Sequence, residues 1–127
     1  MRSFTASTIK CYEEDDVLVI ALSDNAENPA NYIIITRLDN EDNTTVNDGI
    51  GLQTDQAEYE IPDAIEKVII DLDILEVVVK PEFSCFFGSS SILAELPPEG
   101  GDSSEQVFML KNALRNIFSG TNVELVI

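Results

Sequence analysis

The sequence predicts a single α+β domain over residues 1–127, in which a predominantly antiparallel sheet carries one main C-terminal helix packed on one face. Three observations predict this fold. Short runs of β-branched and aromatic residues alternate with turn-forming residues over most of the chain. One stretch with a helical period follows them near the C-terminus. The 127 residues, 44% of them hydrophobic, also suffice for one buried core.

The first three strands are predicted to form a meander. Residues 3–12 are rich in Ser, Thr, Phe and Ile without a helical period, and the acidic residues 13–16 are interpreted as the turn that follows. The apolar run "VLVIAL", residues 17–22, is typical of a strand inside a sheet. Residues 31–37, "NYIIITR", favour a third strand because β-branched and aromatic residues fit a pleated surface. Its two faces are expected to carry Tyr32, Ile34 and Thr36 on one side and Ile33, Ile35 and Arg37 on the other.

A long exposed loop and a hairpin are expected next. Residues 38–51 are dense in Asn, Asp, Thr and Gly, which favour turns, and a weaker strand over 52–59 is separated by Pro62 from the residues that follow. Residues 65–80 are too long for one ordinary strand, so we expect a turn over Asp71 to Ile74. That turn gives the two arms one shared buried face, made of Val68, Ile70, Leu75, Val77 and Val79. Residues 83–87 and 92–96 are interpreted as further short extended pieces.

The C-terminal part predicts the helix and a last strand. Asp102 stands three residues before Glu105, the spacing of a capping box, directly after the breaker cluster "PPEGG". Gly120 is placed to end the helix, and residues 122–127, "NVELVI", are expected to return to the sheet. The apolar stripe of the helix is formed by Val107, Leu110, Leu114, Ile117 and Phe118.

The chain is strongly acidic, with seven basic and 24 acidic residues and a formal charge of −17. Because such a surface repels polyanions, we expect neither nucleic acid nor an anionic membrane as a partner. Complementary potentials raise association rates, so a cationic protein is the natural partner. The alternative, which composition leaves open, is that the acidity only keeps the protein soluble.

Neither a secretion signal nor a disulfide framework is expected. The N-terminal residues lack the apolar core of a signal peptide and "VLVIAL" is too short to cross a bilayer, so we expect a cytoplasmic protein. Cys11 and Cys85 are too few and too far apart for a disulfide framework or a zinc site, and we expect two buried free thiols.

We expect no catalytic residues, no bound metal and no cofactor. The chain has no histidine, which removes the usual nucleophile–base pairs and the commonest zinc ligand. Residues 39–50 have the first ligand spacings of a calcium loop but lack its central glycine and final glutamate. Asp71 and Asp73 fit turn chemistry, although a magnesium-dependent hydrolase that uses these two residues and Glu76 stays an alternative.

Several segments together resemble the immunity protein 10 family of bacterial polymorphic toxin and contact-dependent inhibition systems. The N-terminal likeness lies in "DDVLVIALSD" and "ENPANYIIITR", with Pro29, Tyr32 and Arg37. The C-terminal likeness lies in "AIEKVIIDLDILEVVVKPE" and in a capped helix that ends "LKNALRNIF". The resemblance implies a non-enzymatic cytoplasmic antidote that binds a cognate protein toxin domain, and its acidity fits a basic nuclease toxin.

Two acidic connections are the candidate toxin contacts, because loops can be presented without disturbing the core. They comprise Glu13, Glu14, Asp15, Asp16, Asp39, Glu41 and Asp42. Tyr32 and Arg37 are of types that dominate interfaces, but on a central strand we expect both to pack or pair internally. The alternative to an immunity protein is a homo-oligomeric adaptor without a toxin partner, and a homodimer is compatible with either function.

Overall fold

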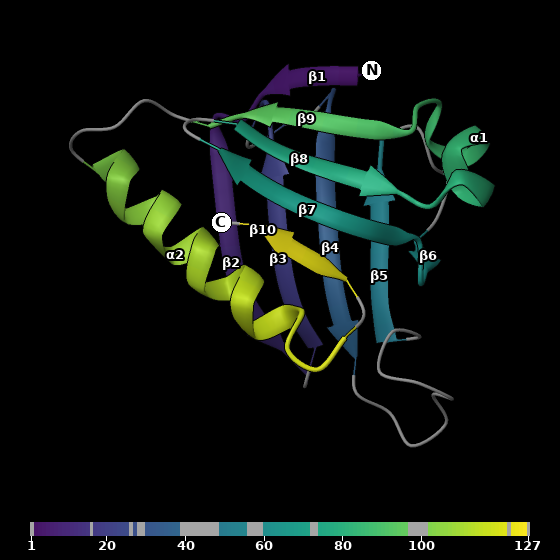
Figure 1. The fold of residues 1–127 in the computed structure, drawn as a ribbon. Coiled ribbons are helices and arrows are strands. Elements are labelled where there is room, and N and C mark those ends of the chain that lie inside the picture. The colour runs from purple at the N-terminus through teal and green to yellow at the C-terminus, as the bar shows by residue number, and fades with distance from the viewer. Residues whose placement is uncertain are drawn as a thin grey trace.

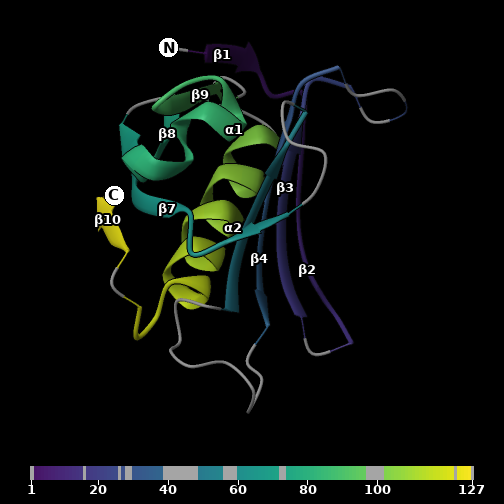
Figure 2. The ribbon, with the colours of Figure 1, turned by 90° about the vertical axis from the view of Figure 1, so that its right-hand side faces the viewer.

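Two stacked sheets, and not the single predicted sheet, form the framework of the protein (Figure 1). The computed structural model describes residues 2–15, 17–25, 27, 30–38, 49–55, 60–71, 74–96, 102–121 and 123–126. The strands of one sheet run across those of the other, and Figure 2 shows the two layers from the side. The fold remains a mixed α and β one, mostly antiparallel, with one main helix.

The first sheet, here called the meander sheet, confirms the predicted N-terminal meander. Its five strands pair antiparallel in chain order. They are β2 (Thr8–Glu14), β3 (Val17–Ser23), β4 (Tyr32–Leu38), β5 (Ile50–Thr54) and β6 (Ile61–Pro62). Ile33 and Ile35 of β4 are fully buried, as the predicted alternation requires. Pro62 is the last residue of the short edge strand β6, where a missing N–H is tolerated, and it separates the meander sheet from β7, as predicted.

The second sheet, here called the mixed sheet, has the order β1-β9-β8-β7-β10. Its strands are β1 (Arg2–Thr5), β9 (Ser91–Glu95), β8 (Ile74–Val79), β7 (Ile65–Asp71) and β10 (Glu124–Val126). The β1/β9 and β7/β10 pairs are parallel, and the others are antiparallel. The parallel β10 follows the helix, because a parallel strand can be reached only by a crossover connection.

The chain changes sheet between Ala6 and Ser7, which corrects the prediction of one strand over residues 3–12. The Ala6 N–H donates to the Glu95 carbonyl oxygen at 2.8 Å in the mixed sheet, whereas the Ser7 N–H donates to the Ser23 carbonyl oxygen at 2.8 Å in the meander sheet. Buried side chains lie at even positions before this point (Phe4) and at odd positions after it (Ile9). A regular strand keeps a period of two and cannot show this shift, whereas two strands in two sheets can.

The predicted hairpin of residues 65–80 is confirmed. Asp71 pairs with Ile74, so β7 and β8 are joined across residues 72 and 73, which lie outside the described residues. The predicted buried face is also confirmed. Its exposed fractions are 0% for Val68, 6% for Ile70, 0% for Leu75, 0% for Val77 and 1% for Val79.

Helix α2 (Asp102–Ile117) begins at the predicted residue and packs against β2 and β3. It lies along the side of the stack in Figure 1 and between the two layers in Figure 2. Leu110, Leu114 and Ile117 are fully buried, which confirms the apolar stripe. Gly120 adopts a left-handed φ of 78° three residues after the last helical residue, in accord with its predicted role.

Residues 83–87 are helical, so the prediction of an extended piece is wrong. The 3-10 turn η2 (Pro81–Phe83) leads into the short helix α1 (Ser84–Phe87), with Pro81 at the start and Gly88 in the left-handed C-cap conformation. A helical turn places Phe83 and Phe87 on the same side, against the core. Cys85 is therefore exposed, not buried as expected, while Cys11 is partly buried, and both are free thiols.

The core lies between the two layers and the helix. Among its fully buried side chains are Leu52 and Ile33 of the meander sheet, Leu75 and Val77 of the mixed sheet, and Leu114 of α2. The three elements thus share one interior. No helix in the described ranges combines the length and the apolar character that spanning a bilayer demands.

Candidate functional site

The outer face of the meander sheet carries the candidate site. Side chains alternate along each strand, so those next to the core residues Ile9, Ile20 and Ile35 point away from it. Figure 2 shows β2, β3 and β4 with one face toward the mixed sheet and α2 and the other face outward. On this outer face Tyr12 is 47% exposed.

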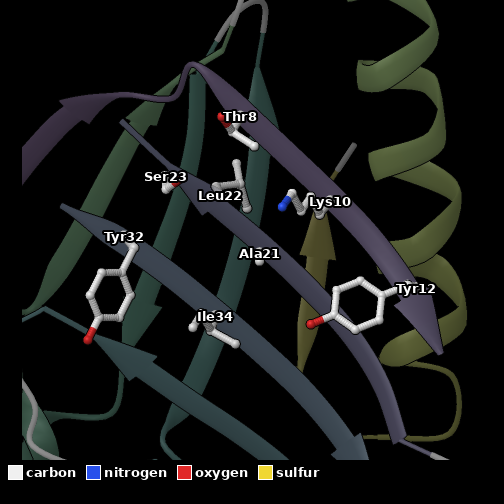
Figure 3. Close-up of a pocket in the computed structure, with 8 residues that line it drawn as sticks. All are labelled: Thr8, Lys10, Tyr12, Ala21, Leu22, Ser23, Tyr32 and Ile34. Carbon is white, nitrogen blue, oxygen red and sulfur yellow. The ribbon is translucent and has the colours of Figure 1, made fainter. Parts of the chain in front are cut away.

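An open hollow of about 320 Å³ lies on this outer face, over β3 (Figure 3). The strand register explains it. Ala21 stands between Lys10 of β2 and Ile34 of β4, and the small Ser23 follows two residues later on the same face. Short side chains on a middle strand, between long ones on both neighbours, leave space above the sheet. The lining residues are Thr8, Lys10, Tyr12, Ala21, Leu22, Ser23, Tyr32 and Ile34.

The hollow combines apolar surface with a few polar groups and one cation. In Figure 3, Lys10 and Tyr12 extend from β2 toward β3, with Ala21 between them and Ile34. Within the described part of the chain, Lys10 has no hydrogen-bond or ion-pair partner. Tyr12 and Tyr32 also line the hollow, and each carries a hydroxyl group that can donate and accept hydrogen bonds. Such a mixture of apolar area and a few placed polar groups is typical of a binding site.

Acidic side chains lie beside the hollow on the same face. Glu14 follows Tyr12 in the outward row of β2 and is exposed. Glu60 lies across Gly51, where an added Cβ atom would collide with the Glu60 carboxylate. The Thr36 hydroxyl donates to Glu60 Oε1 at 2.8 Å and holds it there. The surface therefore has an apolar, tyrosine-rich centre with carboxylates at its margin.

The predicted acidic contacts are only partly within the described residues. Asp16, Asp39, Glu41 and Asp42 lie outside them. Glu13 and Glu14 belong to β2 rather than to the predicted turn, and both are exposed. Because neighbours on a strand point to opposite faces, only Glu14 joins the outer face of the meander sheet.

Glu13 and Asp15 have other positions. Glu13 lies on the α2 side of the sheet, where it lines a small open hollow of about 180 Å³ together with Cys11, Ala113 and Asn116. Asp15 occupies the turn after β2 with a φ of 52°, a conformation that Asp adopts more easily than most residues. The acidic segment is thus divided between two faces and a turn.

Two of the three acids of the alternative magnesium site lie on one face of the mixed sheet. Asp71 and Glu76 both lie on the outer face of the mixed sheet, because Asp71 pairs with Ile74 and Glu76 with Ile69. Asp73 is outside the described residues. Among the residues that are described, no three His, Cys, Asp or Glu side chains are grouped so that they could hold a metal ion.

Two further ionisable groups have perturbed pKa values. Burial raises the pKa of the Cys11 thiol from 9.0 to about 11, because an apolar setting disfavours the thiolate. The pKa of Asp24 is lowered, first by the hydrogen bond from the Asn31 side chain and then by those from the backbone of Asn31 and Ala30. Both groups have structural roles. Cys11 packs against the core, and Asp24 accepts hydrogen bonds from Ala30 and Asn31 across the connection between β3 and β4.

The sequence was also compared with known proteins. It matches no model of a known family and no curated protein. The resemblance to the immunity protein 10 family stays a prediction, as does the absence of enzymatic activity.

The residues of the hollow were not among those predicted for binding. Ala21 lies in an apolar run that was interpreted only as a buried strand, and Tyr32 was expected to pack internally, yet it lines the outer hollow. The available signal was the alternation itself, because Lys10 and Tyr12 are outward residues on β2. The prediction for Arg37 is confirmed, since it donates hydrogen bonds to the end of α2.

Proposed function

We propose that this chain is an immunity protein, which binds a cognate toxin domain in the cytoplasm and blocks it without making or breaking a covalent bond. The contact surface in this proposal is the outer face of the meander sheet. One observation carries it: an exposed sheet face with an open hollow, lined by Tyr12, Tyr32 and Ile34, on a chain of net charge −17.

The composition of this face supports binding to a protein. Aromatic residues are enriched at interface centres, where a large rigid ring gives contact area at a small entropic cost. Tyr12 presents such a ring, 47% exposed, beside the apolar Ala21 and Ile34. Carboxylates at the margin, Glu14 and Glu60, fit the polar rim that surrounds such a centre.

The overall charge supports a cationic partner. A net charge of −17 gives a negative potential that attracts a basic surface and speeds its encounter with the protein. The same charge opposes close approach of a second copy of this chain, so a toxin domain is favoured over the homo-oligomeric adaptor. Many nucleic-acid-cleaving domains are basic because their substrate is a polyanion, and a nuclease toxin would meet this requirement.

Co-expression with the cognate toxin domain tests the proposal. We expect cells to be rescued from that toxin and not from an unrelated one. A pull-down at low and high salt should show slower complex formation as screening increases, because the encounter is steered by charge. A folded protein that neither rescues cells nor binds the toxin would contradict the proposal.

A further inference from the structure

Lys10 is the unexplained feature of the candidate surface. Its exposed side chain lines the hollow from the edge strand β2, opposite Ala21, on a chain with 24 acidic residues. Lys67 and Lys80, by contrast, pair with Glu124 and Asp63, with Nζ–oxygen distances of 3.6 Å and 2.7 Å. Within the described ranges, Lys10 makes no such pair.

A partner that covers the hollow must also satisfy this ammonium group. A side chain that fills the space above Ala21 removes water from Lys10, and a desolvated charge without a counter-ion costs several kcal/mol. The two carboxylates of this face lie elsewhere: Glu14 is opposite Val17, and Glu60 is held by Thr36. The counter-ion is therefore best supplied by the partner.

We infer that the hollow receives an apolar side chain of the partner protein, and that a carboxylate beside this side chain pairs with Lys10. This inference rests on the proposed function and names the chemistry of the bound segment. The partner is then basic overall but carries one Asp or Glu at the centre of its contact surface, next to a Leu, Phe or similar residue. Interface centres combine a filled pocket with a paired charge in this way.

A protein segment fits the hollow better than a free small molecule. The volume of about 320 Å³ is at the lower limit for ligand pockets, and the hollow is open along the sheet. A small carboxylate would leave much of its surface in water there. A protein side chain avoids this, because the surrounding interface excludes water from the filled hollow.

Charge substitutions separate this inference from simple attraction between acidic and basic proteins. If only the overall field mattered, Lys10→Glu would make the chain more acidic and tighten binding to the cognate toxin domain. We expect the opposite: Lys10→Met should weaken binding by about tenfold or more, and Lys10→Glu should weaken it further, because the partner carboxylate loses its cation. Lys111→Glu on α2 is the matched control, since it changes the charge equally and should leave binding unchanged or slightly tighter.

Zero-length carbodiimide cross-linking of the wild-type complex gives a second measurement that needs no variant. It joins an ammonium group to a carboxylate in contact, so we expect an amide between Lys10 and an Asp or Glu of the toxin domain, located by mass spectrometry. Tighter binding of Lys10→Glu, or cross-links from Glu14 but none from Lys10, would overturn the inference and leave the proposed function intact. No binding by the wild-type protein would overturn both.

Discussion

Arg37 Nη1 lies 2.7 Å from the carbonyl oxygen of Ser119, just beyond the last turn of α2. The same atom donates to the carbonyl oxygens of Ile117 at 3.0 Å and Asn116 at 3.3 Å. Asn116 and Ile117 belong to the last turn of α2, whose carbonyl oxygens have no intrahelical N–H partner and form the negative end of the helix. The Asn116 carbonyl oxygen also accepts the Ser119 N–H at 3.4 Å. The Arg37 side chain of β4 therefore links the end of α2 to the meander sheet. Arg37 and Ile117 are 80 residues apart in the sequence.

Replacement of Arg37 should weaken the fold. We expect Arg37→Met to lower the free energy of unfolding by about 1.5–3 kcal/mol, because it leaves carbonyl oxygens without a charged donor. Denaturant unfolding followed by circular dichroism measures this. Arg115→Met is the control: Arg115 is exposed and hydrogen bonds to Asn112 in its own helix, so its loss should cost about 0.5 kcal/mol or less. Equal losses for the two variants would show that the link between α2 and β4 contributes little.

The loop between β3 and β4 should be sensitive to acid. Asp24 accepts hydrogen bonds from Asn31 Nδ2 at 3.0 Å and from the Ala30 N–H at 3.0 Å, which lower its pKa from the ordinary 3.8. A lowered folded-state pKa stabilises the fold above the unfolded value and loses this effect as the pH falls through the folded value. Asp24→Asn should thus be less stable than wild type at about pH 7, with a difference that shrinks below about pH 4.

The matched control for Asp24→Asn is Glu27→Gln, which removes one charge from the same loop at an exposed position. Urea unfolding at about pH 7 and about pH 3 compares the two variants. A destabilisation by Asp24→Asn that is the same at both pH values would mean that ionisation of Asp24 has no part in it.

The two thiols should differ in reactivity. With a pKa raised to about 11 by burial, Cys11 has only about a thousandth of its thiol ionised at about pH 8, and its sulfur is partly covered. Cys85 is exposed on α1. We expect iodoacetamide to modify Cys85 first and Cys11 much later, as followed by peptide mass spectrometry. In Cys85→Ser, the remaining thiol should react only slowly, and fast labelling of this variant would contradict the burial of Cys11.

The Glu60 side chain, and not the backbone conformation, should make glycine necessary at position 51. An added methyl group meets the Glu60 carboxylate, so Gly51→Ala must displace Glu60 and break its hydrogen bond with Thr36. Glu60 is exposed and its side chain can turn aside, so we expect a loss of about 1 kcal/mol at most. In a Glu60→Ala background the same substitution should be neutral or stabilising, since Ala suits a strand better than Gly. A double-mutant cycle by thermal unfolding measures this coupling, and an equal cost in both backgrounds would contradict it.

Local patterns predicted the parts of the fold in which one face is buried. The hairpin of β7 and β8 follows from alternation around Asp71, and the stripe of α2 follows from its helical period. Residues 84–87 were mistaken for an extended piece because a short apolar run fits either structure, and the flanking Pro81 and Gly88 were the better signal.

Features that depend on contacts between distant segments could not be predicted in this way. The change of sheet at Ala6 depends on a hydrogen bond to Glu95, and its only local sign is the shifted spacing of Phe4 and Ile9. The hollow depends on the register of three strands, which places Ala21 between Lys10 and Ile34. Acidic loops stand out in a sequence, whereas a small residue between two long ones becomes visible only once the strands are paired.

The most direct test of the proposed binding face is the affinity of two matched variants for the toxin domain, measured by titration calorimetry. Tyr12 and Ile74 are similarly exposed, at 47% and 42%, on the outer faces of the meander sheet and the mixed sheet. We expect Tyr12→Ala to weaken binding by about tenfold or more, as for an aromatic residue at an interface centre, and Ile74→Ala to leave it unchanged. Unchanged binding by Tyr12→Ala together with weakened binding by Ile74→Ala would contradict the assignment of the binding face.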